Sequence, residues 1–194
     1  MCISAPILRI VETDQNAPAR CNLSSVHLIG AHCFRAFSKG TTMSATERIL
    51  AAARTRALDQ LYAGAVTPQE AYALLQGDPK VKLVDVRTNA ERDWIGRVTI
   101  PPAQHAAIEW STWPGGVPNP AFAQQLEQVA ARDDILLFLC RSGVRSRHAA
   151  RVATEQGYTE SFDILEGFEG DKDAEGHRKT VGGWCKAGLP WMGA

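Results

Sequence analysis

The sequence predicts an α/β fold in which helices cover both faces of a mainly parallel central sheet. Three short apolar runs are typical of buried strands, at 81–86, 135–139 and 162–165. Segments that open with helix-capping residues separate these runs, and this alternation indicates parallel pairing through right-handed crossovers. Because ligands of such sheets bind beyond the carboxyl ends of the strands, the residues after each run are the first candidates for a functional site.

The composition is that of an ordinary globular protein and excludes several classes of function. Of the 194 residues, 45% are hydrophobic and 22% are charged, which is enough for a buried core. The 21 basic and 21 acidic side chains cancel, so no field over the whole molecule would attract nucleic acid or anionic lipid. No apolar run approaches the roughly 20 residues of a membrane helix. We therefore expect neither a nucleic-acid nor a membrane partner.

The cysteines indicate a reducing compartment rather than a disulfide framework. There are five, an odd number, and their spacing is irregular. Cys21, His27, His32 and Cys33 match none of the tight paired motifs of structural zinc. We expect a cytoplasmic protein without a metal or another cofactor.

The first 43 residues are predicted to be a poorly ordered extension. They lack clean periodicity, and they lack the basic start and continuous apolar stretch of a secretory signal. Two interpretations stay open. The Arg and Ser content of the segment, with few acids, is compatible with a transit peptide, and a natural start at Met43 would make the segment an artefact of start-site choice.

A capping box predicts the first helix. Ser44 and Glu47 stand three residues apart, ahead of apolar residues at helical spacing. The pattern predicts a helix over 45–62, within an N-terminal helical segment 44–66.

The main domain, 67–194, opens with a second cap. Thr67 is the capping residue, Pro68 occupies the first helical position, and Glu70 follows the cap by three residues. This combination predicts a short helix over 68–75.

The remaining elements follow from the same kinds of signal: apolar runs, capping residues and prolines or glycines at the ends. In chain order they are a strand at 81–86, a helix opened by Thr88 with Glu91, a long connection over 97–116 with a short strand at 98–100, a helix over 119–132, a strand at 135–139, a helix over 146–156 and a strand at 162–165.

The loop after the run 135–139 carries the chemistry, because a buried strand there meets a turn and the start of a helix. Successive backbone N–H groups in such a turn curve around one point and bind an anion. Their partial positive charge, with arginines nearby, favours the nucleophilic thiolate of a cysteine. We expect Cys140 to be the catalytic nucleophile. The candidate substrate-binding residues complete the loop: Arg141, Ser142, Gly143, Val144, Arg145 and Ser146.

The same loop suits a persulfide. A persulfide on Cys140 would end in a sulfur anion that the N–H groups are placed to stabilise. Gly143 lets the backbone turn without a side chain in the pocket. The arginines can pair with an oxyanion such as the sulfonate end of thiosulfate.

Here the sequence resembles the rhodanese family, from about Thr67 to Trp191. Besides the loop, the similar segments are the strand signature 83–87, the opening helix 67–70 and the closing segments 182–184 and 187–190. The resemblance implies a three-layer rhodanese-like fold. It also implies supporting roles for Asp85 and Arg87, interpreted as a structural pair at a strand end, and for Glu91, which stands where the family usually has an acid.

The resemblance also implies an activity. In the family, the pattern Cys-Arg-x-Gly-x followed by Arg or Thr is associated with thiosulfate as sulfur donor, and residues 140–145 fit it. Cys140 would then take the outer sulfur of thiosulfate, release sulfite and pass the sulfur to cyanide or a thiol. A protein donor or acceptor stays open.

The chain departs from the family pattern in two places. Arg97 follows Gly96 where the family commonly has histidine. A polar segment, 168–181, separates Gly167 from Gly182, which the family usually joins closely. This insertion is a candidate for substrate specificity or partner docking.

Three other functions stay open. A cysteine phosphatase or arsenate reductase shares this loop design but requires arginine at the sixth position after the cysteine, where this chain has Ser146. A non-catalytic binding module is the second, although such modules have often lost the cysteine. A persulfide carrier fed by a protein donor would use the same chemistry at Cys140.

Two further groups of residues are interpreted as structural or incidental. Cys185 could resolve the persulfide as a disulfide, but a lone cysteine near the C-terminus more often has no such role. The tryptophans Trp110, Trp113 and Trp184 are expected to be core or pocket-wall residues, since no basic stripe accompanies them.

Overall fold

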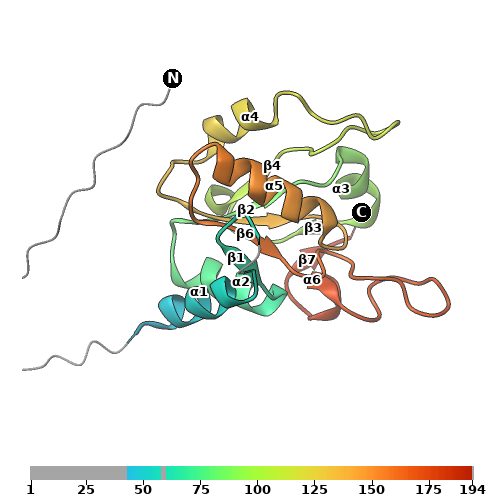
Figure 1. Ribbon diagram of the computed structural model, residues 1–194. Helices are drawn as coiled ribbons and strands as arrows, with labels where there is room; N and C mark the ends of the chain where they lie inside the picture. The colour runs from blue at the N-terminus through green and yellow to red at the C-terminus, as the bar shows by residue number, and fades with distance from the viewer. Residues whose placement is uncertain (1–42, 58–59, 194) are drawn as a thin grey trace, which may run out of the picture. The chain divides into compact units, whose positions relative to one another are not determined.

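A computed structural model describes residues 43–57 and 60–193, and these form a three-layer α/β fold (Figure 1). The five strands of the central sheet are all parallel and lie in the order β1-β6-β5-β2-β4. The predicted extension before Met43, with its candidate metal ligands, lies outside the described residues. The mainly parallel sheet expected from the sequence is confirmed.

The strands of this sheet bring together segments from the whole described chain. Their bounds are β1 Gly64–Val66, β2 Val81–Asp85, β4 His105–Ala107, β5 Ile135–Leu139 and β6 Ser161–Ile164. The three predicted apolar runs are β2, β5 and β6, and they are the three inner strands.

Helix α1, Ala45–Thr55, begins at the predicted capping box but is shorter than predicted. Its side chains Leu50 and Ala53 pack in the core on one face of the sheet, whereas Tyr62 packs in the core on the other face. A single helix over 45–62 cannot reach both faces, so the helix ends and the chain crosses the sheet edge. The segment predicted as helical then supplies β1, which pairs with β6.

Two more capping boxes are confirmed. Helix α2, Pro68–Gly77, is capped by Thr67, and α3, Asn89–Ile95, is capped by Thr88. In each, the glutamate three residues after the cap accepts a hydrogen bond from the backbone N–H of the capping residue. These local hydrogen bonds explain why the starts of both helices could be predicted.

The connection 97–116 contains more structure than predicted. After the short strand β3, Arg97–Val98, a 3-10 turn over Pro102–Gln104 leads into β4, which pairs in parallel with β2 at the sheet edge. The chain then makes a hairpin, in which Ser111 bridges Pro118. Strand β3 pairs instead with the C-terminal strand β7, Trp191–Met192.

The remaining helices differ slightly from prediction. Helix α4, Phe122–Val129, is shorter at both ends than predicted. It starts later because Asn119 accepts the N–H of Ala121 in a turn before the helix. Helix α5, Val144–Glu155, begins two residues earlier than predicted, directly after Gly143. A short helix near the C-terminus, α6 over Gly183–Lys186, was not predicted.

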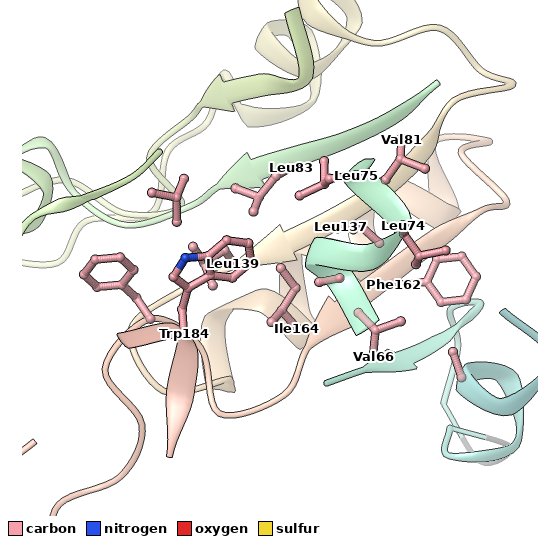
Figure 2. Packing of buried hydrophobic residues seen from close by; sticks show 14 of the residues in the cluster. Val66, Leu74, Leu75, Val81, Leu83, Leu137, Leu139, Phe162, Ile164 and Trp184 are labelled. Atoms are coloured by element: carbon pink, nitrogen blue, oxygen red, sulfur yellow. The ribbon is translucent and has the colours of Figure 1, made fainter. Parts of the chain in front are cut away.

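Two apolar clusters hold the helices to the sheet. On one face α1, α2 and Trp184 of α6 pack with side chains of the sheet such as Leu83 and Leu137 (Figure 2). On the other face α4 and α5 pack on Leu136 and Phe138. Successive side chains of β5 point to opposite faces of the sheet. Helices cover both faces, so these side chains are buried on either side.

None of the described helices has the length and apolar character needed to cross a membrane. Within residues 43–57 and 60–193, no three His, Cys, Asp or Glu side chains lie close enough together to hold a metal ion.

Candidate active site

Cys140 lies at the carboxyl end of β5, in the middle of the sheet, where a ligand site is expected for this topology. Its side chain continues the alternation of β5 and packs in the cluster beneath α5. Only 1% of the residue is exposed. The backbone is held as well, since the Cys140 carbonyl accepts the N–H of Phe168 at 2.8 Å. The thiol position is therefore fixed by the core.

The loop after Cys140 turns back over its sulfur. The N–H of Gly143 donates to Cys140 Sγ at 3.0 Å, and the thiol is 3.5 Å from the Ser146 hydroxyl. Gly143 has φ +93°, in the left-handed region that favours glycine. Helix α5, of 12 residues, starts at the next residue. The sulfur thus faces the positive end of a helix, which stabilises a thiolate or another anion there.

A second glycine allows the segment after β6 to pass directly beneath the loop. Gly167 has φ +64°, and a Cβ built on it would lie 2.5 Å from the Cys140 carbonyl oxygen. Its own carbonyl accepts the N–H of Trp184 at 2.8 Å. The sequence singled out Gly167 only as one end of the insertion, whereas the structure shows that it is required for this close approach.

The predicted loop residues are brought together, but they face different environments. Ser146 is fully buried beside the sulfur, and Ser142 is partly buried in the turn. The side chain of Val144 is exposed and lines a separate cavity with Tyr62 and Arg147. Val144 can therefore serve the Cys140 site through its backbone alone.

Carboxylates or carbonyls hold the three arginines around the loop. Arg141 Nε donates to Glu169 at 2.6 Å, and Arg147 Nε donates to the Gly143 carbonyl at 3.0 Å. Arg145 uses both terminal nitrogens to bind Glu91, at 2.8 and 2.6 Å. Sequence reasoning named Arg141 and Arg145 as anion-binding residues but did not find these partners.

The ion pair of Glu91 and Arg145 is half-buried, and it affects both groups. Burial raises the pKa of Glu91, but the hydrogen bonds from Arg145 and Thr88 outweigh it, so the pKa lies below its usual value. Burial lowers the pKa of Arg145, but the hydrogen bonds to Glu91 prevail and the pKa is raised. Both groups therefore stay charged at neutral pH. The ion pair also places Glu91, the predicted supporting residue, beside the loop.

Asp85 and Arg87 form a fully buried ion pair at the end of β2, with Nη2 of Arg87 2.7 Å from the carboxylate. The guanidinium of Arg87 also lies over the ring of Phe168, 3.9 Å from its centre. Arg92 donates to the backbone carbonyls of Asp85 and Arg87. These contacts fit the predicted structural role, and Arg92 is a partner that the sequence did not indicate.

The insertion 168–181 begins inside the site rather than on the surface. Phe168 is completely buried and Glu169 nearly so. The N–H of Glu169 donates to the Arg141 carbonyl at 2.9 Å, and its carboxylate holds the Arg141 side chain. Residues 171–181 are all exposed or partly exposed. Only this later part is available for docking a partner.

An open cleft of about 620 Å³ lies over the loop, between α3 and the 111–118 hairpin. Arg141 and Arg145 form part of its lining. Two exposed tryptophans line it as well, Trp94 at 75% exposure and Trp113 at 64%. Of the three tryptophans that the sequence singled out, Trp113 is at a pocket wall as expected, and Trp184 is in the core.

Cys185 does not have the properties of a resolving thiol. It is half-buried, and burial raises its pKa to about 11. Little thiolate is present at neutral pH, and the thiolate is the form that attacks a persulfide.

Comparison with known proteins supports this architecture. The family model for the rhodanese-like domain matches residues 67–174. A crystal structure of Rv0390 from M. tuberculosis is 41% identical, with a TM-score of 0.63, and the match covers 69% of this chain and 99% of that one. Thiosulfate sulfurtransferase GlpE of Haemophilus influenzae is 29% identical over 125 residues, or 64% of this chain and 90% of the relative. An uncharacterized protein of Rickettsia conorii is 32% identical over 126 residues, which cover 63% of this chain and 92% of the relative.

Proposed function

Because the chain belongs to the rhodanese-like domain family, we propose that it is a sulfurtransferase that carries sulfane sulfur as a persulfide on Cys140. The observation that carries this proposal is the position of Cys140 Sγ. It accepts the Gly143 N–H at 3.0 Å and faces the start of α5 at the carboxyl end of the central strand. An anion centred there is stabilised in either of two forms, as the thiolate or as the outer sulfur of the persulfide.

Thiosulfate is the proposed donor. The Cys140 thiolate attacks the outer sulfur of thiosulfate, a new S–S bond forms, and the bond to the sulfonate sulfur breaks to release sulfite. The Cys140 persulfide anion remains. The terminal nitrogens of Arg141 are the groups proposed to bind the sulfonate oxygens, since its Nε is already held by Glu169. The similarity to thiosulfate sulfurtransferase GlpE supports the choice of donor.

The second half-reaction returns the thiolate. A nucleophile, cyanide or a thiolate, attacks the outer sulfur of the persulfide, and Cys140 leaves as thiolate. No redox cofactor is needed, because the S–S bond to Cys140 breaks as the bond between the outer sulfur and the acceptor forms, and no outside oxidant or reductant takes part. A protein persulfide could replace thiosulfate as donor with the same chemistry at Cys140.

The loop is a poorer fit for a phosphatase or arsenate reductase. At the sixth position after Cys140, where those enzymes place an arginine, Ser146 is buried with its hydroxyl 3.5 Å from the sulfur. Arg145 is committed to Glu91 through both terminal nitrogens. A clamp for a tetrahedral oxyanion would need these donors to face the substrate.

We place the protein in a reducing, cytoplasmic setting. Among the described residues Cys140 and Cys185 are both free thiols, and the proposed reaction starts from a free thiol at Cys140.

Intact mass spectrometry tests the proposal. The reduced protein is incubated with thiosulfate, desalted and weighed, then treated with cyanide and weighed again. We expect a gain of about 32 Da, one sulfur, that cyanide removes. Cys140→Ser should show no gain, whereas Cys185→Ser should load like the parent. Loading of Cys140→Ser, or absence of loading in the parent with either thiosulfate or a persulfide donor, would overturn the assignment.

A further inference from the structure

The cleft over the loop is much larger than the small molecules of the proposed reaction. Its volume of about 620 Å³ lies in the range of roughly 300–1,000 Å³ that is typical of sites for drug-sized organic ligands. A cyanide ion or a thiosulfate ion would fill a small part of it. The remaining space has a defined shape and lining, which a sulfur acceptor of larger size could use.

Two indole rings form the most unusual part of this lining. Trp94 on α3 is 75% exposed and Trp113 on the hairpin is 64% exposed, although both are large apolar side chains. Neither ring is paired with another aromatic ring among the described residues. Where exposed aromatic residues line a concave site, a flat or apolar ligand that covers them binds more favourably, because the rings are removed from water.

The polar groups of the cleft favour a ligand that carries a hydrogen-bond acceptor. Arg145 is neutralised by Glu91, but Arg141 uses only Nε toward Glu169 and its side chain is 42% exposed. Its two terminal nitrogens make no hydrogen bond among the described residues, and Arg141 is part of the cleft lining. A carboxylate is the common organic group that binds such a pair of donors.

We propose that the sulfur acceptor is a bulky organic thiol with an aromatic or apolar body and a carboxylate, and that Trp94 and Trp113 select it. The inference rests on the proposed function and names the substrate class of the same site. The acceptor thiol loses its proton to solvent, its thiolate attacks the outer sulfur of the Cys140 persulfide, and the S–S bond to Cys140 breaks. The products are an organic persulfide anion and the Cys140 thiolate.

The proposal requires the persulfide, rather than the buried thiol itself, to meet this acceptor. Cys140 is 1% exposed and does not line the cleft, whereas the next residue, Arg141, does. The outer sulfur of a persulfide extends about 2 Å beyond Sγ. In the proposal the acceptor thiolate attacks this outer sulfur, while the cleft holds the body of the acceptor.

Steady-state kinetics with thiosulfate as donor test the selection, with 4-mercaptobenzoate, thiophenol and cyanide as acceptors. For Trp94→Ala and Trp113→Ala we expect the ratio of kcat/KM for 4-mercaptobenzoate to that for cyanide to fall at least about fivefold. Val117→Ala, an exposed residue of the same hairpin that does not line the cleft, is the matched control and should keep the parent ratio. A ratio within twofold of the parent in both tryptophan variants would overturn the proposal. A parent that prefers thiophenol to 4-mercaptobenzoate would overturn the part assigned to Arg141.

Binding of an inert analogue separates this inference from the proposed function. Calorimetry with 4-(methylthio)benzoate, which cannot accept sulfur, should give a Kd that rises at least about fivefold in either tryptophan variant. If the parent fails to load sulfur but binds the analogue in this way, the function is wrong and the cleft assignment stands. If the parent loads sulfur but does not bind the analogue, the cleft assignment is wrong and the function stands. A requirement for a protein acceptor would show as sulfur loading without transfer to any of the three small acceptors, and it too would overturn the inference.

Discussion

The carboxylate of Glu91 accepts hydrogen bonds from both terminal nitrogens of Arg145, at 2.8 and 2.6 Å, and so joins the start of α3 to the first turn of α5. The same carboxylate accepts the backbone N–H of Thr88 and completes the cap of α3. One side chain thus supports a helix start and positions an arginine of the candidate active site. Its two roles are separable by experiment.

Glu91→Ala should destabilise the protein by about 3 kcal/mol, because it leaves a half-buried guanidinium without its partner and removes a cap. Chemical denaturation measures the free energy of unfolding. Glu47→Ala removes the equivalent glutamate of the exposed capping box of α1, which pairs with no arginine among the described residues, and should cost clearly less. Equal losses would mean that the cap alone accounts for the effect.

Arg141→Ala should raise the KM for thiosulfate about tenfold, equivalent to about 1.4 kcal/mol of binding free energy. The reason is the loss of the two terminal donors proposed to bind the sulfonate. Initial-rate kinetics with cyanide as acceptor measure the change. Arg151→Ala serves as control, since this exposed arginine of α5 pairs with Glu155 alone in the part of the chain that the structure describes. An unchanged KM in Arg141→Ala would show that Arg141 does not bind the donor.

Gly167→Ala should destabilise the protein by more than 2 kcal/mol and abolish sulfur loading. The new Cβ would meet the Cys140 carbonyl oxygen at 2.5 Å, a clash with backbone that no side-chain rotation can relieve. Gly176→Ala is a matched control: its φ of +86° is also left-handed, but apart from its chain neighbours no atom of the described residues lies within 4 Å of the added Cβ. That variant should lose only about 1 kcal/mol, the conformational cost of alanine at positive φ. Thermal unfolding measures the stability of both variants, and intact mass spectrometry measures their sulfur loading. Similar losses of stability in the two variants would contradict the assigned contact of Gly167.

Asp163→Asn should stabilise the protein at pH 8 but not at pH 4. Asp163 is fully buried in β6, with one carboxylate oxygen bound by the Tyr62 hydroxyl at 3.0 Å and the other without a hydrogen bond among the described residues. Burial raises its pKa to about 6, above the ordinary 3.8. Between these values the folded state binds more protons than the unfolded state, so the stability of the parent falls as pH rises from about 4 to 6.

The asparagine cannot ionise, so above pH 6 the variant should gain on the order of 2 kcal/mol over the parent. The measurement is the free energy of unfolding across this pH range, with the exposed Asp171→Asn as control. A difference between Asp163→Asn and the parent that does not change with pH would show that Asp163 is not the titrating group.

Sequence reasoning succeeded where the interactions are local. Three capping boxes, at Ser44, Thr67 and Thr88, each depend on hydrogen bonds between residues three apart, and all three are present. The inner strands were recognisable because both faces of the sheet are covered, which leaves unbroken apolar runs. The residues around Cys140 are contiguous in the chain, so the loop itself could also be read from the sequence.

Sequence reasoning failed where a residue depends on a distant partner. The pattern after Thr55 is compatible with more helix, but pairing of β1 with β6 requires an extended chain there. Strand β4 has three residues and no clear periodicity, and its existence depends on the free edge of β2. An edge strand of this length carries too little local signal to be recognised.

By itself the sequence determined the α/β class, the order of the inner strands along the chain, and the position of Cys140 between a buried strand and a helix start. Only the tertiary structure decided which groups surround that cysteine. Glu169 reaches Arg141 across 28 residues of sequence, and Glu91 reaches Arg145 across 54. Trp94 and Trp113 share one cleft because α3 and the hairpin meet over the loop. Local hydrogen bonds and apolar periodicity depend on residues that are close in the sequence. The contacts around Cys140 and in the cleft depend instead on the order of the parallel strands in the sheet.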